Sequence, residues 1–154
     1  MSTSTDSSSS PLPALGLLKH LTDAERAELS AYGTFIDHQK GEKLVEQGRP
    51  QGHLHFVLEG ELRVVAASEE ALLTLGYVEP GESVGEMTLL EPVEAASANV
   101  VAQSPVKVWA IQRRDFDDFI HHHPAASGKI LREIAVLLAQ RLRRRTEHLM
   151  QAER

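Results

Sequence analysis

Two histidines and a glutamate near the middle of the chain have the spacing of metal ligands, in the order His53-x-His55-x3-Glu59. Imidazole nitrogens on one face of a strand, with a carboxylate nearby, are good ligands for iron or zinc. The histidines alternate with Leu54 and Phe56, however, so a strand here should turn them away from the apolar interior. We therefore expect no tightly bound metal in this group.

A second set of polar residues surrounds Glu86, in the segment Gly85-Glu86-Met87. The Glu86 carboxylate could accept the hydroxyl of a sugar or cap a short helix, and the residues alone favour neither role. Thr88 and Ser97 are expected to form local hydrogen bonds with the backbone. Five glutamates and no lysine or arginine occur from residue 79 to residue 94, so this region is acidic.

Basic side chains gather near the end of the chain, at Arg141 and in the run 143–145. Cations are favourable near the C-terminal end of a helix, so we expect a solvated basic face, with contact to an acidic partner protein as the alternative. The three histidines at positions 121–123 are expected to lie at the C-terminal end of an earlier helix, where positive charge is also favourable. We expect them to bind no metal.

The composition of the chain limits the classes of protein to which it can belong. Its 154 residues, with 42% hydrophobic and 25% charged residues, are typical of one globular domain. The absence of cysteine excludes disulfides, thiolate zinc sites and cysteine nucleophiles, and it fits the reducing cytoplasm. A net charge of −6 argues against a free-standing nucleic-acid-binding protein. Neither a secretory signal nor an apolar stretch of about 18 residues is present, so we expect no membrane association.

Local patterns predict the order of the elements. A disordered Ser-rich tail is expected at residues 1–13, and Thr22 with Glu25 forms a capping box that begins a helix ending before Gly33. Short β-rich runs with Gly and Pro between them follow at residues 34–111. A helix at 113–122 and a long helix from about residue 127 to residue 150 complete the chain. This order predicts an α+β fold, an antiparallel β-roll of the jelly-roll or double-stranded β-helix type, flanked by an N-terminal helix and a long C-terminal helix.

Four motifs in this order carry a resemblance to a known family. They are Lys40-Gly41-Glu42 with Gln47-Gly48, the strand–glycine–strand segment 56–64, Pro80-Gly81-Glu82 followed by Val84-Gly85-Glu86-Met87, and the helical segment 138–142. Together they resemble the cyclic-nucleotide-binding domain, the sensor half of the catabolite-activator family of bacterial regulators. The resemblance covers about residues 15–150 and implies a roll with flanking helices at residues 14–126, followed by a dimerisation helix at residues 127–154.

The resemblance also implies a ligand site. In that family a cassette glutamate accepts the ribose hydroxyl, and an arginine ten residues later pairs with the cyclic phosphate. Glu86 and Ser97 match the family pattern, but Ala96 stands at the position of the arginine. Losing the partner of a buried phosphate costs about 2–5 kcal/mol, so a micromolar site would weaken to about 0.1 mM or worse. The candidate ligand-binding residues are Val64, Leu75, Val84, Gly85, Glu86, Met87, Ala96, Ser97 and Thr146.

An apolar stripe follows one face of the long C-terminal helix, at Leu131, Ile134, Leu138, Leu142 and Leu149. In the family that this chain resembles, the same helix pairs across a two-fold axis, so we expect a parallel homodimer. The stripe is interrupted at Arg145 and Thr146, where family members bring residues to the nucleotide base. Thr146 suits a base contact, whereas Arg145 introduces a charge.

These observations predict a regulatory sensor for a small ligand, with cyclic nucleotide possible but weakly bound, and not an enzyme. A ligand-free dimeric scaffold that docks on a partner protein is the alternative. The least favoured hypothesis is a metal-dependent enzyme, because the histidine pattern resembles the first motif of the cupins but residues 81–101 lack the histidine of the second. Family regulators continue past the long helix into a helix-turn-helix, so a chain that stops at Arg154 is expected not to bind DNA directly.

Overall fold

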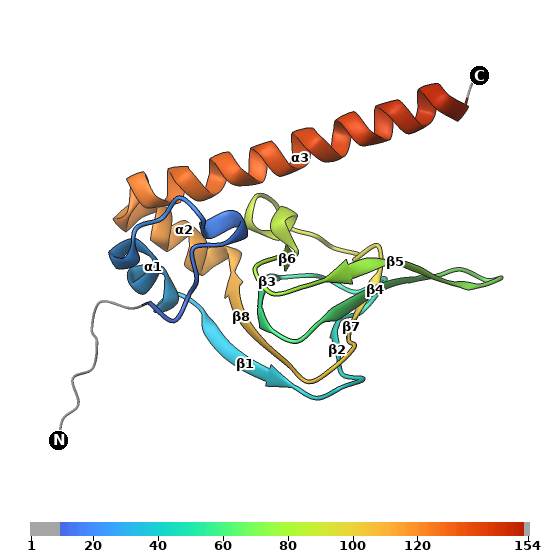
Figure 1. Ribbon diagram of the computed structural model, residues 1–154, viewed down its shortest axis with the longest axis horizontal. Coiled ribbons are helices and arrows are strands. Elements are labelled where there is room, and N and C mark those ends of the chain that lie inside the picture. Colours follow the sequence, from blue (N-terminus) through green and yellow to red (C-terminus); the bar gives the residue numbers. More distant parts are fainter. Residues whose placement is uncertain (1–9, 153–154) are drawn as a thin grey trace.

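Two four-stranded sheets face each other in a computed structural model that describes residues 10–152, with two shorter helices at one end and the long C-terminal helix along one side (Figure 1). One sheet has the strand order β1-β8-β3-β6 and the other β2-β7-β4-β5, and all paired strands are antiparallel. This confirms the predicted roll between flanking helices. The strands are β1 Thr34–His38, β2 Lys43–Val45, β3 His53–Glu59, β4 Leu62–Ala67, β5 Leu72–Val78, β6 Ser83–Val84, β7 Asn99–Ala102 and β8 Val106–Gln112.

Helices cover the open end of the roll and one of its sides. They are the 3₁₀ turns η1 Gly16–Leu18 and η2 Glu86–Leu89, and the α-helices α1 Asp23–Ser30, α2 Arg113–His122 and α3 Pro124–Ala152. The predicted capping box is present, because the Thr22 hydroxyl accepts from the Glu25 amide and the Glu25 carboxylate accepts from the Thr22 amide. The pair satisfies two backbone donors that the first turn of α1 leaves free.

Strands β3 and β8 separate two hydrophobic cores. On one face, Phe56 and Trp109 pack against residues of the helices, including Phe119 and Ile134. On the other face, Val57 and Val108 pack between the two sheets. Since alternate side chains of a strand point to opposite faces, both faces of these strands are buried. The first of these cores holds the helices against the roll.

The ends of the chain differ from the sequence-based boundaries in two places. A tail was predicted at residues 1–13, of which residues 1–9 lie outside the described residues. In the described part of this segment, Leu12 is fully buried and its carbonyl accepts a hydrogen bond from Arg26. Packing therefore begins before residue 13, because one leucine in the Ser-Pro segment reaches the helical core. Helix α3 starts at Pro124 instead of about residue 127, since proline is well tolerated in the first turn of a helix.

The structure also corrects the expected orientation of the strand histidines. His55 is only 6% exposed and shares a face of β3 with Val57, toward the space between the sheets. Alternation correctly separated the histidines from Leu54 and Phe56, but it cannot reveal that the opposite face is buried as well. The Nδ1 atom of His55 is buried without a hydrogen-bond partner.

We predict that His55 makes the stability of the protein depend on pH. Burial, and then the nearby positive charges of His53 and His38, lower the pKa of His55 from 6.5 to about 4. The unfolded chain therefore binds this proton at a higher pH than the folded chain, and the free energy of unfolding falls as the pH drops from about 6.5 to about 4. At about pH 4.5 the loss should be about 2 kcal/mol.

Urea unfolding at about pH 7 and about pH 4.5 measures this loss. The variant His55→Leu should not show the part of this loss that the protonation of His55 causes. The variant His148→Leu, on the exposed part of α3, should show the full wild-type loss. An equal loss in all three proteins would contradict the prediction.

Candidate ligand-binding cavity

A cavity of about 550 Å³ opens between the roll and α3. Pockets of this size accommodate small organic molecules. Its wall is built from the second sheet (β2, β4, β5 and β7), from β6, η2 and the loop that leads to β7, from Gln51 before β3, and from one residue of α3. The lining residues are Val45, Gln51, Val64, Tyr77, Val78, Glu82, Ser83, Val84, Gly85, Glu86, Met87, Thr88, Val93, Ala95, Ala96, Ser97, Ala98, Val100 and Arg141.

The turn at Gly85 directs the next residue into the cavity. Gly85 has a φ of 87°, in the left-handed region that favours glycine, and an added Cβ would collide with the carbonyl oxygen of His53. Two hydrogen bonds from Thr88 reach the Gly85 carbonyl, one from its amide and one from its hydroxyl. The local hydrogen bond expected of Thr88 is therefore confirmed.

The Glu86 carboxylate is buried but has a partner for each oxygen. Glu86 is 3% exposed; its Oε2 accepts a hydrogen bond from the Ser83 hydroxyl at 2.9 Å, and its Oε1 lies 3.2 Å from Nη1 of Arg141. A buried charge is tolerated when it is paired and hydrogen-bonded in this way. The same pair connects η2 to α3.

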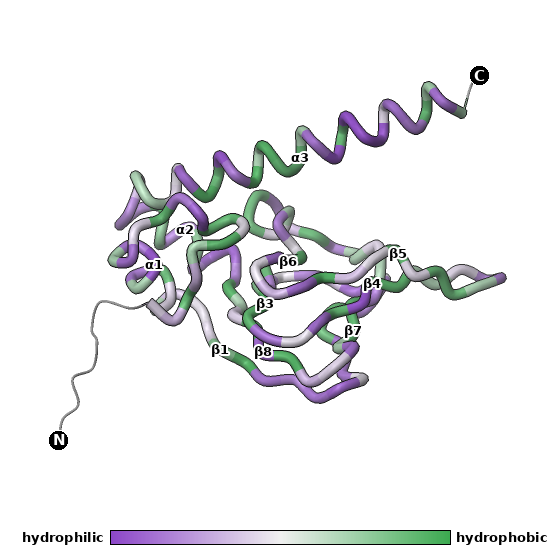
Figure 2. Tube along the Cα trace, viewed as in Figure 1, coloured by the Kyte–Doolittle hydropathy of each residue, from purple (hydrophilic) through white to green (hydrophobic). Residues whose placement is uncertain are grey.

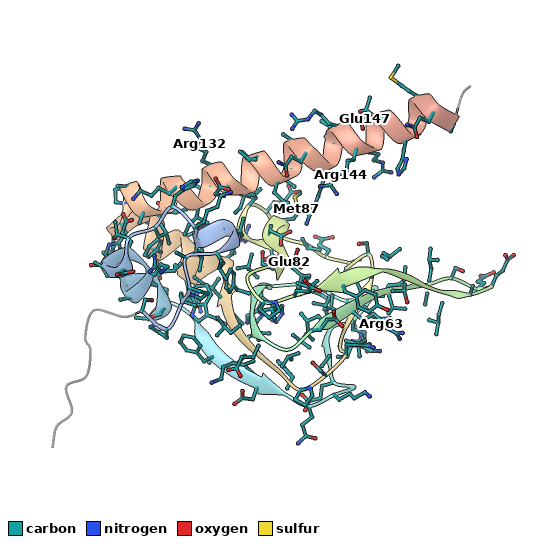
Figure 3. The ribbon with its side chains drawn as sticks, in the orientation of Figure 1. Arg63, Glu82, Met87, Arg132, Arg144 and Glu147 are labelled. Carbon is teal, nitrogen blue, oxygen red and sulfur yellow. The ribbon has the colours of Figure 1, made fainter. Side chains whose placement is uncertain are left out.

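Arg141 was not among the sequence-predicted site residues, because its neighbours at 143–145 suggested a solvated basic face. It follows Leu138 by three residues, and Leu138 packs on the helical core, so both lie on the side of α3 that faces the domain. The spacing from Leu138 was the signal that could have identified it. Figure 3 shows Met87 and Glu82 below α3, whereas Arg132 and Glu147 point from α3 away from the roll.

Most of the sequence-predicted site residues meet at this cavity. Those that line it are Val64, Val84, Gly85, Glu86, Met87, Ala96 and Ser97. Ala96 is 8% exposed, and its amide and carbonyl bond to the backbone of Arg49 and Gly48. A small side chain therefore occupies this buried position in the cavity wall.

Two predicted residues do not line the cavity. Leu75 is 55% exposed, as are its ladder-paired neighbours Leu73 and Tyr77 at 62% and 52%, and a register shift between Val64 and Val65 leaves Leu75 without a partner on β4. Thr146 lies on the exposed second half of α3, where its hydroxyl donates to the carbonyl of Leu142. Strict alternation in β5 could not anticipate the shift.

The residues of the metal hypothesis do not form a metal site in the described part of the chain. Within residues 10–152 no three His, Cys, Asp or Glu side chains are placed to hold one ion. His53 and His55 have ring centroids 5.8 Å apart, while Glu59 is exposed near the amine of Lys107.

Comparison with known proteins shows the family. The family model described as "Cyclic nucleotide-binding domain" matches residues 35–123, and the chain belongs to this family. The catabolite activator protein of Thermus thermophilus has a similar structure, with a TM-score of 0.79 and 28% identity over 90% of this chain and 63% of that one. The N-terminal domain of a transcriptional regulator from Streptomyces coelicolor A3(2) has a TM-score of 0.75 and 27% identity, over 89% of this chain and 95% of that one.

Among curated proteins, Glutaminase 1 of Bradyrhizobium diazoefficiens is 37% identical over 126 residues. These residues are 82% of this chain but 20% of the glutaminase, so the chain spans about a fifth of this relative. None of the helices among residues 10–152 has the length and hydrophobicity needed to cross a membrane.

We predict that Gly85 is required for two reasons: its φ is positive, and a side chain at this position would collide with the backbone of β3. Gly48 has a similar φ of 83° but open space around its Cβ position, so Gly48→Ala isolates the backbone strain. That strain should cost about 1–2 kcal/mol, and Gly85→Ala should cost about 1–3 kcal/mol more, because its methyl group meets the backbone of β3. Urea unfolding of the two variants gives the difference, and equal losses would show that the contact with His53 can relax.

Proposed function

We propose that this domain is a regulatory sensor that binds a small ligand in the cavity and binds cAMP only weakly. The observation that carries the proposal is the composition of the cavity wall. Glu86 is held in place to accept a ligand hydroxyl, while the buried position 96, which would pair with a cyclic phosphate, holds alanine. The name of one relative, the cAMP-activated global transcriptional regulator CRP of Escherichia coli O157:H7, supports a regulatory role at 29% identity over 64% of the chain.

A second candidate function is a dimeric scaffold that docks on a partner protein. It is favoured by the exposed second half of α3, where Leu142, Leu149 and Met150 are 67%, 64% and 63% exposed. Hydrophilic residues predominate on the part of α3 that extends beyond the roll (Figure 2). The two functions are compatible, because a sensor can transmit the state of its cavity through the same helix.

We predict that cAMP and cGMP bind with affinities no better than about 0.1 mM. Titration calorimetry measures this directly, and a low-micromolar dissociation constant would contradict it. The variant Ala96→Arg supplies the missing partner for the phosphate and should improve cAMP affinity by about tenfold or more. No gain in a folded Ala96→Arg protein would mean that the wall around position 96 cannot present a phosphate-binding side chain.

We predict a parallel homodimer through α3. Leu138 already packs in part on the helical core of its own chain, so Leu142 and Leu149 are the better test positions on that face. Replacing both by glutamate places unpaired carboxylates in the interface, at a cost of several kcal/mol, and should give a folded monomer.

Light scattering at micromolar concentration reports the mass. The paired variant Gln140→Glu and Gln151→Glu adds the same charge on the opposite face of α3 and should remain dimeric. A monomeric wild-type protein would refute the dimer.

A further inference from the structure

More acidic than basic side chains of the described residues line the cavity. Among residues 10–152, the charged side chains that line this cavity are those of the acidic Glu82 and Glu86 and of the basic Arg141. The Nη1 atom of Arg141 lies 3.2 Å from Oε1 of Glu86, which is 3% exposed. Two carboxylates of the described residues therefore share one guanidinium, and an incoming anion meets an excess of acidic groups.

An anionic ligand would share Arg141 with Glu86 or displace Glu86 from it, and in both cases it would lie close to the Glu86 carboxylate. If Arg141 turned to the ligand, the buried Glu86 carboxylate would keep only the hydroxyl of Ser83 and would face a second negative charge. Leaving a buried charge without its partner is strongly unfavourable, so this exchange weakens the binding of an anion. A neutral ligand leaves the pair between Arg141 and Glu86 intact.

The remaining wall favours a molecule with an apolar body and hydroxyl groups. Aliphatic side chains from the strands and the loop supply most of it, among them Val45, Val64, Val78, Val93, Ala98 and Val100. Each carboxylate oxygen has two lone-pair positions, so Glu86 can accept a ligand hydroxyl while it stays bonded to Ser83 and Arg141. Ser97 adds a hydroxyl to the same wall.

We infer that the ligand is an uncharged molecule of nucleoside size that carries hydroxyl groups, and not a cyclic phosphate. This inference rests on the proposed small-ligand function and names the ligand class of the same cavity. Glu86 is then the anchor for the ligand hydroxyl and also the group that excludes anions, because it holds Arg141.

Calorimetric titration and thermal shift with four probes, adenosine, guanosine, cAMP and cGMP, test the inference. At least one nucleoside should bind about tenfold or more tightly than its own cyclic monophosphate. The variant Glu86→Gln keeps the shape of the side chain but releases Arg141. It should weaken nucleoside binding and strengthen cyclic monophosphate binding, each by several-fold or more, whereas loss of a purely structural glutamate would weaken both.

The control variant Glu94→Gln removes an equal charge from the same acidic loop at an exposed position that does not line the cavity, and it should preserve the wild-type order. Equal or tighter binding of the cyclic monophosphate to the wild-type protein would overturn the inference but leave the proposed sensor function standing. Failure of all four probes to bind or to stabilise the folded protein at millimolar concentration would overturn the inference and count against the sensor function as well.

Discussion

The ion pair between Glu86 and Arg141 joins the cavity wall to α3, and the proposed binding and response of this domain both depend on it. Glu86 belongs to the turn that follows β6, and Arg141 belongs to α3, so a single contact of 3.2 Å joins the cavity wall to the helix that leaves the domain. The pair is buried on the glutamate side and half-exposed on the arginine side, with side-chain exposures of 3% and 51%. A molecule that displaced Arg141 from Glu86 would therefore also change a contact of α3. Because a conformational response requires different interactions in the two states, we propose this pair as the point of coupling.

The helical core holds only the first half of α3, so a response of this helix to a ligand would be limited to the rest of its length. Its first half is fixed by Ile130 and Ile134 in the helical core, whereas residues 139–152 are exposed in the single chain. Arg141 lies just beyond the fixed part. A change at Glu86 can thus alter the exposed segment without disturbing the packing that holds the helix to the roll.

The sequence was sufficient to predict the fold because its local signals agree with one another. The capping box at Thr22 and the helix at 113–122 both lie where the patterns placed them. Signals that depend on tertiary packing were less visible. The buried face of His55, the packed Leu12 and the exposure of Leu75 follow from how the two sheets and the helical end meet. Arg141 was missed for the same reason, since a run of arginines favours solvent until its place on the helix face is known.

The central claim is that residues of the segment 83–98 line one ligand cavity together with Arg141, and that alanine at position 96 provides no positive charge there to pair with a phosphate. Nuclear magnetic resonance of ¹⁵N-labelled protein tests it most directly, because chemical shifts report even millimolar binding residue by residue. On titration with adenosine and, separately, with guanosine, the account predicts that at least one of them causes progressive shifts of the Gly85, Glu86, Ser97 and Arg141 amides, with the β1–β2 segment unchanged. Shifts confined to β1–β2 or α1, or a spectrum that does not change, would contradict it.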